Sequence, residues 1–152
     1  MSLRDRISSD LKTAMKAKDS VKLATLRLIN AAIKDREIAA RGDGTSGELS
    51  DGDLVAVLTR MVKQRRDSAR AYEEAARLDL AEKEIAEIAV IETFLPRQMT
   101  DDEMTTAVDA AIAETGATSV RDIGKVMGVL KARHAGEMDF GKAGAIVKAK
   151  LA

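Results

Sequence analysis

Two glycines, Gly124 and Gly128, lie inside a stretch whose apolar spacing predicts a helix over residues 119–136. Glycine in a helix interior costs about 0.5–1 kcal/mol relative to alanine, so two such positions need a reason. On a helical projection both fall opposite the apolar side chains, beside Arg121 and Lys125. Bare main chain next to cations is a surface that a phosphate backbone can approach. Close packing against another helix would use the same glycines, and residue types alone leave both interpretations open.

The helix expected to carry this surface has signals at both ends. Ser119 with Asp122 three residues later resembles a capping box, in which each residue bonds the other's backbone N–H. Gly136 follows the last periodic residue, where a C-terminal glycine is common. The apolar stripe expected to face the core consists of Val120, Ile123, Met127 and Leu130.

A second basic face lies in the predicted helix that contains residues 60–70. Its candidate phosphate contacts are Lys63, Arg66 and Arg70. The simpler interpretation is a solvated helix face, whose cations pair with carboxylates nearby on the same helix. Those carboxylates are Asp67, Glu73 and Glu74. Arg65 instead falls in line with the apolar residues of its helix, so it either extends its head to solvent or pairs across the bundle.

Motifs that carry enzymatic chemistry are not evident. His134 is the only histidine, and it is expected near a helix C-terminus with no partner at motif spacing. Gly124 and Lys125 do not form a phosphate-binding loop, because Ser119 and Val126 occupy the positions where that motif needs glycine and Ser or Thr. With no cysteine, the sequence offers no thiol nucleophile and no thiolate metal site. We therefore expect no catalytic residue, no cofactor and no metal.

The composition indicates a globular helical chain. Hydrophobic residues make up 45% and charged residues 33% of 152, and aromatic residues only 2%. Twenty-five basic and twenty-five acidic residues cancel, which argues against a strongly basic nucleic-acid binder. Any attractive field must therefore be local and sensitive to salt. No apolar run approaches the ~20 residues needed to span a bilayer, and the sequence begins without the apolar core of a secretory signal, so a cytoplasmic location is expected.

Helical periodicity predicts an all-α fold in two parts. Four helices are expected in residues 1–95, and the second of them is apolar nearly all round in its first half, which indicates a central position. Glycine-rich residues 41–47 predict a loop. Pro96, the only proline, cannot continue a helix and predicts a hinge. Three shorter helices follow in residues 96–152, which are expected to form a small C-terminal domain.

Several segments resemble known proteins. Residues 119–151, with Asp122-Ile-Gly-Lys-Val-Met-Gly128, resemble the tail domain of GatB, a subunit of the glutamine-dependent tRNA amidotransferase. Three further segments resemble the stand-alone YqeY proteins: Leu26-Arg-Leu-Ile-Asn-Ala-Ala-Ile-Lys34, Lys63-Gln-Arg-Arg-Asp-Ser68 and Glu92-Thr-Phe-Leu-Pro-Arg-Gln98. Because these segments occur in the same order, the resemblance extends over essentially the whole chain.

The resemblance implies contact with RNA rather than a reaction. In GatB the tail is a helical appendage that contacts the tRNA body, whereas amide transfer takes place in a larger domain with no counterpart here. The family label of a carbon–nitrogen ligase with glutamine as amide donor is therefore not expected to be intrinsic to this chain. The resemblance and the glycine-bearing basic face together predict a non-catalytic, bacterial-type protein that binds tRNA or another structured RNA. The candidate contacts are Arg121, Gly124, Lys125, Gly128, Lys131 and Lys148.

The alternative is a protein-interaction module. Either the basic residues 60–70 or the C-terminal part would then dock a protein partner, with the amidotransferase itself as a candidate. A third hypothesis, an amide-transferring enzyme in its own right, requires catalytic groups that the sequence does not show.

Overall fold

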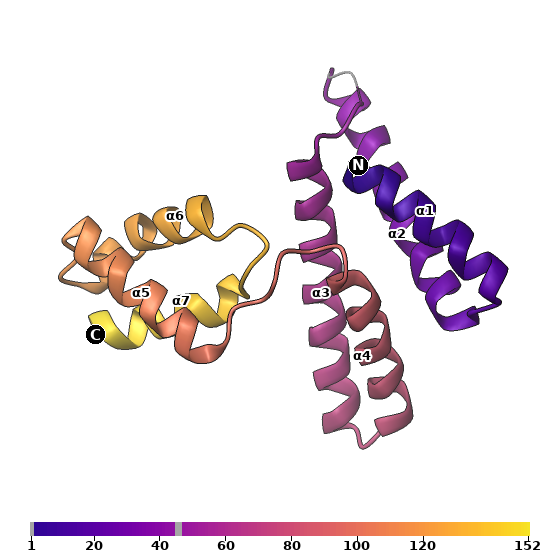
Figure 1. Cartoon of the computed structure of the whole chain (residues 1–152). Helices are drawn as coiled ribbons and strands as arrows, with labels where there is room; N and C mark the ends of the chain where they lie inside the picture. Colours follow the sequence, from indigo (N-terminus) through magenta and orange to yellow (C-terminus); the bar gives the residue numbers. More distant parts are fainter. Residues whose placement is uncertain (1, 45–46) are drawn as a thin grey trace. The chain divides into compact units, whose positions relative to one another are not determined.

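The computed structural model describes residues 2–44 and 47–152, so Thr45 and Ser46 of the predicted loop lie outside the described residues. The described residues contain seven α-helices, one short 3-10 turn and no strand (Figure 1). The all-α prediction is therefore confirmed. The chain divides into two compact units, Met1–Leu95 and Pro96–Ala152. Whether Pro96 acts as a hinge between them stays a prediction.

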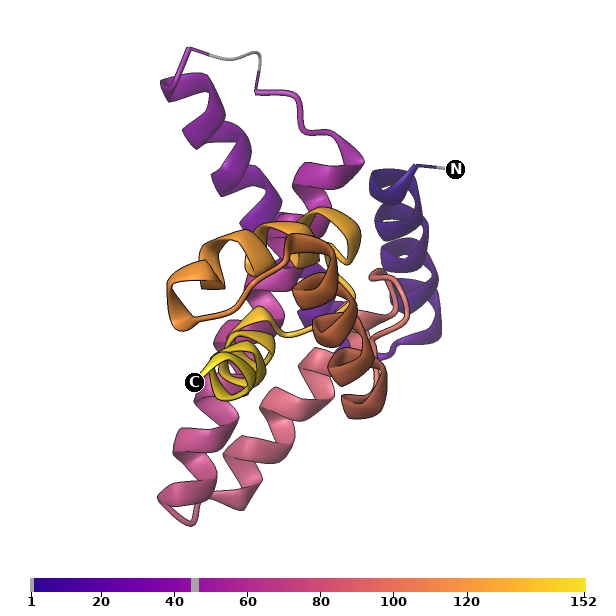
Figure 2. The same cartoon turned by 90° about the vertical axis from the view of Figure 1, so that its left-hand side faces the viewer.

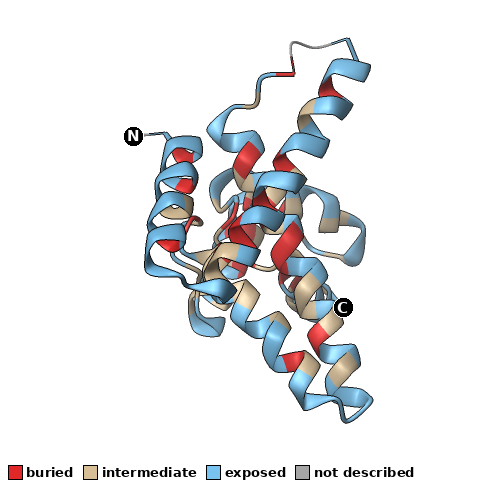
Figure 3. Ribbon diagram, turned by 90° about the vertical axis from the view of Figure 1, so that its right-hand side faces the viewer, coloured by how far each residue is buried: buried red, intermediate tan, exposed pale blue. Residues whose placement is uncertain are grey.

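Four helices build the first unit: α1 (Leu3–Ala17), α2 (Ser20–Gly42), α3 (Asp51–Glu74) and α4 (Leu78–Glu92). Their shared core consists of branched aliphatic side chains that are almost completely buried (Figure 3). Burying each of them contributes about 1.5–3 kcal/mol. The central members are Ile7, Leu26, Ile29, Leu54, Leu58 and Ile91.

The beginning of α3 is fixed by a capping box between Ser50 and Asp53. Ser50 Oγ accepts a hydrogen bond from Asp53 N at 3.1 Å, and Asp53 Oδ2 accepts one from Ser50 N at 3.0 Å. The α3 helix stops at Glu74. Ala76 has a φ of 58°, in the left-handed region, and this turns the chain into α4.

Arg65 joins α3 to α4. Its Nε lies 2.8 Å from Glu87 Oε2 and its Nη1 donates to the Met61 carbonyl at 3.3 Å. Both charged side chains expose only 14% of their surface, so the pair is largely removed from water. Of the two roles that the sequence left open for Arg65, the structure shows pairing across the bundle.

The α2 helix contacts the other three helices of the unit, as its predicted central position implies, but one of its apolar faces is open among the described residues. Leu26 and Ile29 are buried, but Val21 exposes 55% of its surface and Leu28 exposes 43%. The helix therefore has two apolar faces, of which one packs in the unit and the other is open among the described residues. The helix also continues to Gly42, so its last residues replace the start of the predicted loop.

The second unit is a three-helix bundle with one 3-10 turn. It consists of α5 (Asp101–Thr115), η1 (Val120–Asp122), α6 (Ile123–Arg133) and α7 (Phe140–Leu151). After a short loop, α7 packs against α6 and crosses it (Figures 1 and 2). The buried core comes from all three helices and the loop before α7: Met104, Val108, Ala111, Val126, Leu130, Met138, Ala143 and Val147.

Candidate nucleic-acid interface

The candidate surface begins at the turn that leads into α6. The Asp122 carboxylate accepts hydrogen bonds from Thr118 N at 3.0 Å and Ser119 N at 3.4 Å. These bonds, that of Thr118 foremost, lower the pKa of Asp122, and the positive charge of Lys125 adds to the effect. An ionised Asp122 thus holds the backbone that positions Arg121, which is exposed.

The predicted start and apolar stripe of this helix need correction. Residues 120–122 form the 3-10 turn η1, and the α-helix begins only at Ile123. Val120 consequently leaves the expected stripe and exposes 43% of its surface. Val126, absent from the expected stripe, is fully buried beside Leu130. The core-facing side of α6 is therefore centred on residues 126 and 130.

Gly124 and Gly128 lie on the opposite side and are exposed. A Cβ atom placed on either glycine meets no heavy atom within 4 Å among the described residues, apart from its chain neighbours and its own helix backbone. Close packing of α6 against another helix of the second unit is therefore not the reason for these glycines. The glycine that does contact α6 is Gly144, where a Cβ would lie 3.9 Å from the Met127 methyl group.

The eight basic residues of the second unit fall into two groups of four. One group pairs with carboxylates: Arg97 with Glu103 at 2.6 Å, Arg133 with Glu114, Lys142 with Asp101 at 2.6 Å, and Lys150 with Asp109 at 2.7 Å. The other group is exposed and makes no ion pair with any described residue. Its members are Arg121, Lys125, Lys131 and Lys148, the four cations that the sequence analysis proposes as phosphate contacts.

Three of these cations accompany the glycines on η1 and α6. Arg121 and Lys125 lie on either side of Gly124 in the chain, and Lys131 lies one turn beyond Gly128. Lys148 comes from α7, one turn after the Gly144 position that contacts Met127, so it lies on the side of α7 next to α6. The arrangement combines unobstructed main chain with unpaired positive charge, which suits a phosphate backbone.

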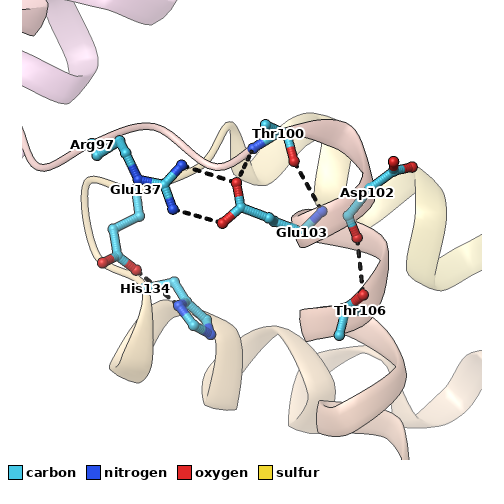
Figure 4. A network of polar contacts seen from close by, with 7 residues as sticks. All are labelled: Arg97, Thr100, Asp102, Glu103, Thr106, His134 and Glu137. Carbon is cyan, nitrogen blue, oxygen red and sulfur yellow. Dashed lines mark hydrogen bonds and ion pairs between the residues drawn. The ribbon is translucent and has the colours of Figure 1, made fainter.

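The C-terminal end of α6 and the loop after it make contacts within the second unit. The helix ends at Arg133, and the predicted terminal glycine, Gly136, lies two residues beyond the capping residue His134 with a φ of 76°. His134 Nδ1 lies 2.8 Å from Glu137 Oε2 (Figure 4). Two hydrogen bonds attach the segment after Pro96 to this loop. The Gln98 side-chain amide donates to the Gly136 carbonyl at 2.6 Å, and Met99 N donates to the Glu137 carbonyl at 2.7 Å.

A capping network at the start of α5 adjoins this loop. Glu103 accepts hydrogen bonds from Arg97 and from Thr100 N, and Thr100 Oγ1 accepts one from Glu103 N (Figure 4). The Arg97 guanidinium foremost, and the Thr100 backbone and hydroxyl next, lower the pKa of Glu103 from 4.5 to about 2. The carboxylate therefore stays ionised in the folded chain at pH values where it would be protonated in the unfolded chain.

This pKa predicts how acid affects the second unit. The pKa of Glu103 is lower in the folded chain than in the unfolded chain. The stabilisation that the ionised Glu103 gives to the fold is therefore complete above about pH 4.5 and is lost as the pH falls toward 2. We expect the chain to have a higher thermal midpoint than a Glu103→Gln variant above pH 5, and the difference to shrink between pH 4.5 and 2. Asp102→Asn is the control, because the Asp102 carboxylate has no hydrogen bond or ion pair among the described residues. A difference that is independent of pH would contradict the prediction.

The second basic face is largely neutralised by carboxylates. Lys63 Nζ lies 3.6 Å from Asp67 Oδ2, as expected from their spacing on one helix. Arg66 Nη2 lies 2.8 Å from Glu92 Oε1 of α4, a partner that the sequence analysis did not foresee. Arg70 is exposed and makes no ion pair with the described residues. Of the three candidate contacts on this face, Arg70 alone keeps its charge unpaired in the described part of the chain.

Among residues 2–44 and 47–152, no three or more acidic or histidine side chains come together in a way that would hold a metal ion. In the same residues, no helix is both long and apolar enough to cross a bilayer.

Comparison with known proteins identifies the family. Residues 4–151 match the family model of the Yqey-like proteins, which is nearly the whole chain. The chain belongs to the YqeY family. This finding confirms the relationship that the three segments in residues 26–98 indicate.

Curated relatives carry the name "Altered inheritance of mitochondria protein 41, mitochondrial". The chain is 41% identical to that of Clavispora lusitaniae over 93 residues, which cover 61% of this chain and 51% of the relative. It is 39% identical to that of Candida glabrata over 89 residues, covering 59% and 47%. The chain thus spans about half the length of the curated relatives it matches. These relatives are mitochondrial proteins of yeasts, so they do not support the bacterial-type expectation.

Proposed function

We propose that this YqeY-family chain is a non-catalytic protein that binds tRNA or another structured RNA through its second unit. The observation that carries the proposal is the open face of α6, where Gly124 and Gly128 have free space above their main chain. Positive charge is available at the same place, because the four cations on and beside this face are unpaired and the other four are not. The resemblance of residues 119–151 to the GatB tail makes tRNA the preferred RNA.

Titration of the purified chain with tRNA tests the proposal. Four phosphate contacts imply that the logarithm of the binding constant falls with the logarithm of salt with a slope of about −3. Replacing Lys125, which lies between the two glycines, by glutamate is expected to weaken binding about tenfold and to reduce the slope by about one. Lys142→Glu is the matched control, because Lys142 is already paired with Asp101. Salt-independent binding, or equal loss in both variants, would refute the proposal.

Docking to a protein, such as the amidotransferase, is the second candidate function. The basic face of residues 60–70 supports it less than expected, because Lys63, Arg65 and Arg66 all have carboxylate partners. A pull-down with and without ribonuclease separates the two functions, since a complex that survives digestion rests on protein contacts. Glutaminase or transamidation activity of the pure chain would contradict both.

Neither RNA binding nor docking to a protein determines the cellular compartment of this chain. The cytoplasmic location expected from the sequence stays a prediction, and the names of the relatives make mitochondria the alternative. Fluorescent tagging of the chain in its own host would distinguish the two locations.

A further inference from the structure

The exposed side of α2 has the residue pattern of one strand of a coiled coil. Its positions repeat every seven residues, with Val21, Leu28 and Asp35 in one row and Ala24, Ala31 and Ile38 in the other. These are the a and d rows of a heptad, and five of the six residues are apolar. We name these six residues the α2 seam.

The seam is open along its length. Val21 exposes 55%, Leu28 43% and Ile38 56% of its surface, and the remaining three residues are also exposed. Single exposed apolar residues are common on protein surfaces and need no explanation. Here, however, they recur at the spacing of a helix–helix contact over five turns of one helix, while Leu26, Ile29 and Ile33 bury the opposite side.

The charges that border the open side of the seam are of one sign. The g positions, which border the d row, are Arg27, Lys34 and Arg41. All three are exposed, and none makes an ion pair with a described residue. The e positions, which border the a row, carry no charge: Thr25 is buried, Ala32 is half-buried and Ala39 is exposed. A helix laid on the seam would therefore meet cations on its open border.

We propose that the α2 seam docks an amphipathic helix of a partner protein, with apolar residues in its a and d rows and glutamate or aspartate in its flanking rows. In coiled coils these flanking charges set partner choice, so a row of cations selects an acidic helix and rejects a basic one. Asp35, the one charged seam residue, fixes the register, because it requires a lysine, arginine or polar group opposite it. This inference is independent of the proposed RNA surface, which lies in the other unit.

A synthetic peptide pair provides the probe. Both peptides have leucine at a and d, and one has glutamate while the other has lysine at every e and g position. Repulsion between like charges keeps each peptide from pairing with itself. With the full chain, fluorescence anisotropy is expected to show at least tenfold tighter binding of the glutamate peptide, with the preference decreasing as salt is added.

Variants of the chain connect this binding to the seam. Leu28→Ser is expected to weaken binding of the glutamate peptide about tenfold without changing the thermal midpoint, because the side chain is exposed. Ile85→Ser is the matched control, since Ile85 is similarly exposed on α4, outside the seam. Arg27→Glu with Lys34→Glu should reverse the preference and favour the lysine peptide.

Three results would overturn the proposal. The first is equal affinity for the two peptides, or none for either. The second is binding that Ile85→Ser weakens as much as Leu28→Ser. The third is concentration-dependent self-association of the chain that Leu28→Ser abolishes in analytical ultracentrifugation, because the occupant of the seam would then be a second copy of this chain.

Discussion

The affinity for tRNA is expected to fall by about a hundredfold or more when the four unpaired cations of the second unit are replaced together by glutamine. These are Arg121, Lys125, Lys131 and Lys148. Each is exposed and has no carboxylate partner among the described residues, so each can release a counterion to solution when it binds a phosphate. A cation already engaged by a carboxylate contributes less, because its charge is partly compensated before RNA arrives.

The measurement is a filter-binding or anisotropy titration at several salt concentrations. The slope of the logarithm of the binding constant against the logarithm of salt should change from about −3 to near zero in this variant. The matched control replaces the four paired cations, Arg97, Arg133, Lys142 and Lys150, by glutamine, which changes the net charge by the same amount. If the control loses as much affinity as the variant, net charge rather than the α6 face determines binding, and the proposed interface is wrong.

The division of the eight cations into paired and unpaired groups was not predictable from the sequence. Pairs on one helix follow from spacing, and Lys63 with Asp67 is such a pair. Three of the four pairs in the second unit join different helices, as Lys142 of α7 joins Asp101 at the start of α5, 41 residues earlier. Their formation depends on the angles at which helices pack, which hydrophobic periodicity does not determine.

Helix ends were predictable where a side chain caps the backbone and not elsewhere. The Ser50–Asp53 and Thr100–Glu103 boxes begin α3 and α5, and both match the capping-box pattern in the sequence, since their hydrogen bonds are local. The end of α3 depends instead on a positive φ at Ala76, a residue type that gives no turn signal. Likewise, the pattern Ser119 with Asp122 suggested a helix from residue 120, whereas a 3-10 turn precedes α6. That turn shifted Val120 out of the stripe and Val126 into the core.

The open face of α6 also predicts opposite effects on stability and on binding. Replacing Gly124 and Gly128 together by alanine is expected to stabilise the chain by about 1–2 kcal/mol, because alanine restricts the unfolded chain and favours the helix. Neither glycine has a positive φ, and neither new methyl group would meet a neighbour within 4 Å in the described structure. Glycines kept only for helix packing would instead lose stability on this replacement.

The affinity of the same variant for tRNA should decrease although its stability increases. The two methyl groups would stand between the main chain of α6 and a phosphate backbone that approaches it, so we expect tRNA affinity to fall about tenfold, equivalent to about 1.4 kcal/mol. Chemical denaturation and tRNA titration of the same purified variant measure both effects. Gly52→Ala is the control, because Gly52 is also an exposed glycine in a helix, near the start of α3 in the first unit, whereas the four unpaired cations belong to the second unit.

The combination of the two measurements distinguishes a contact surface from an unused one. A more stable variant with weakened tRNA binding indicates that the main chain of α6 takes part in the contact. A more stable variant with unchanged binding would show that the cations act without the glycines, and the role proposed for Gly124 and Gly128 would be wrong. A less stable variant would mean that the helix needs these glycines for a packing contact outside the described structure, which would remove the argument that their face is open for RNA.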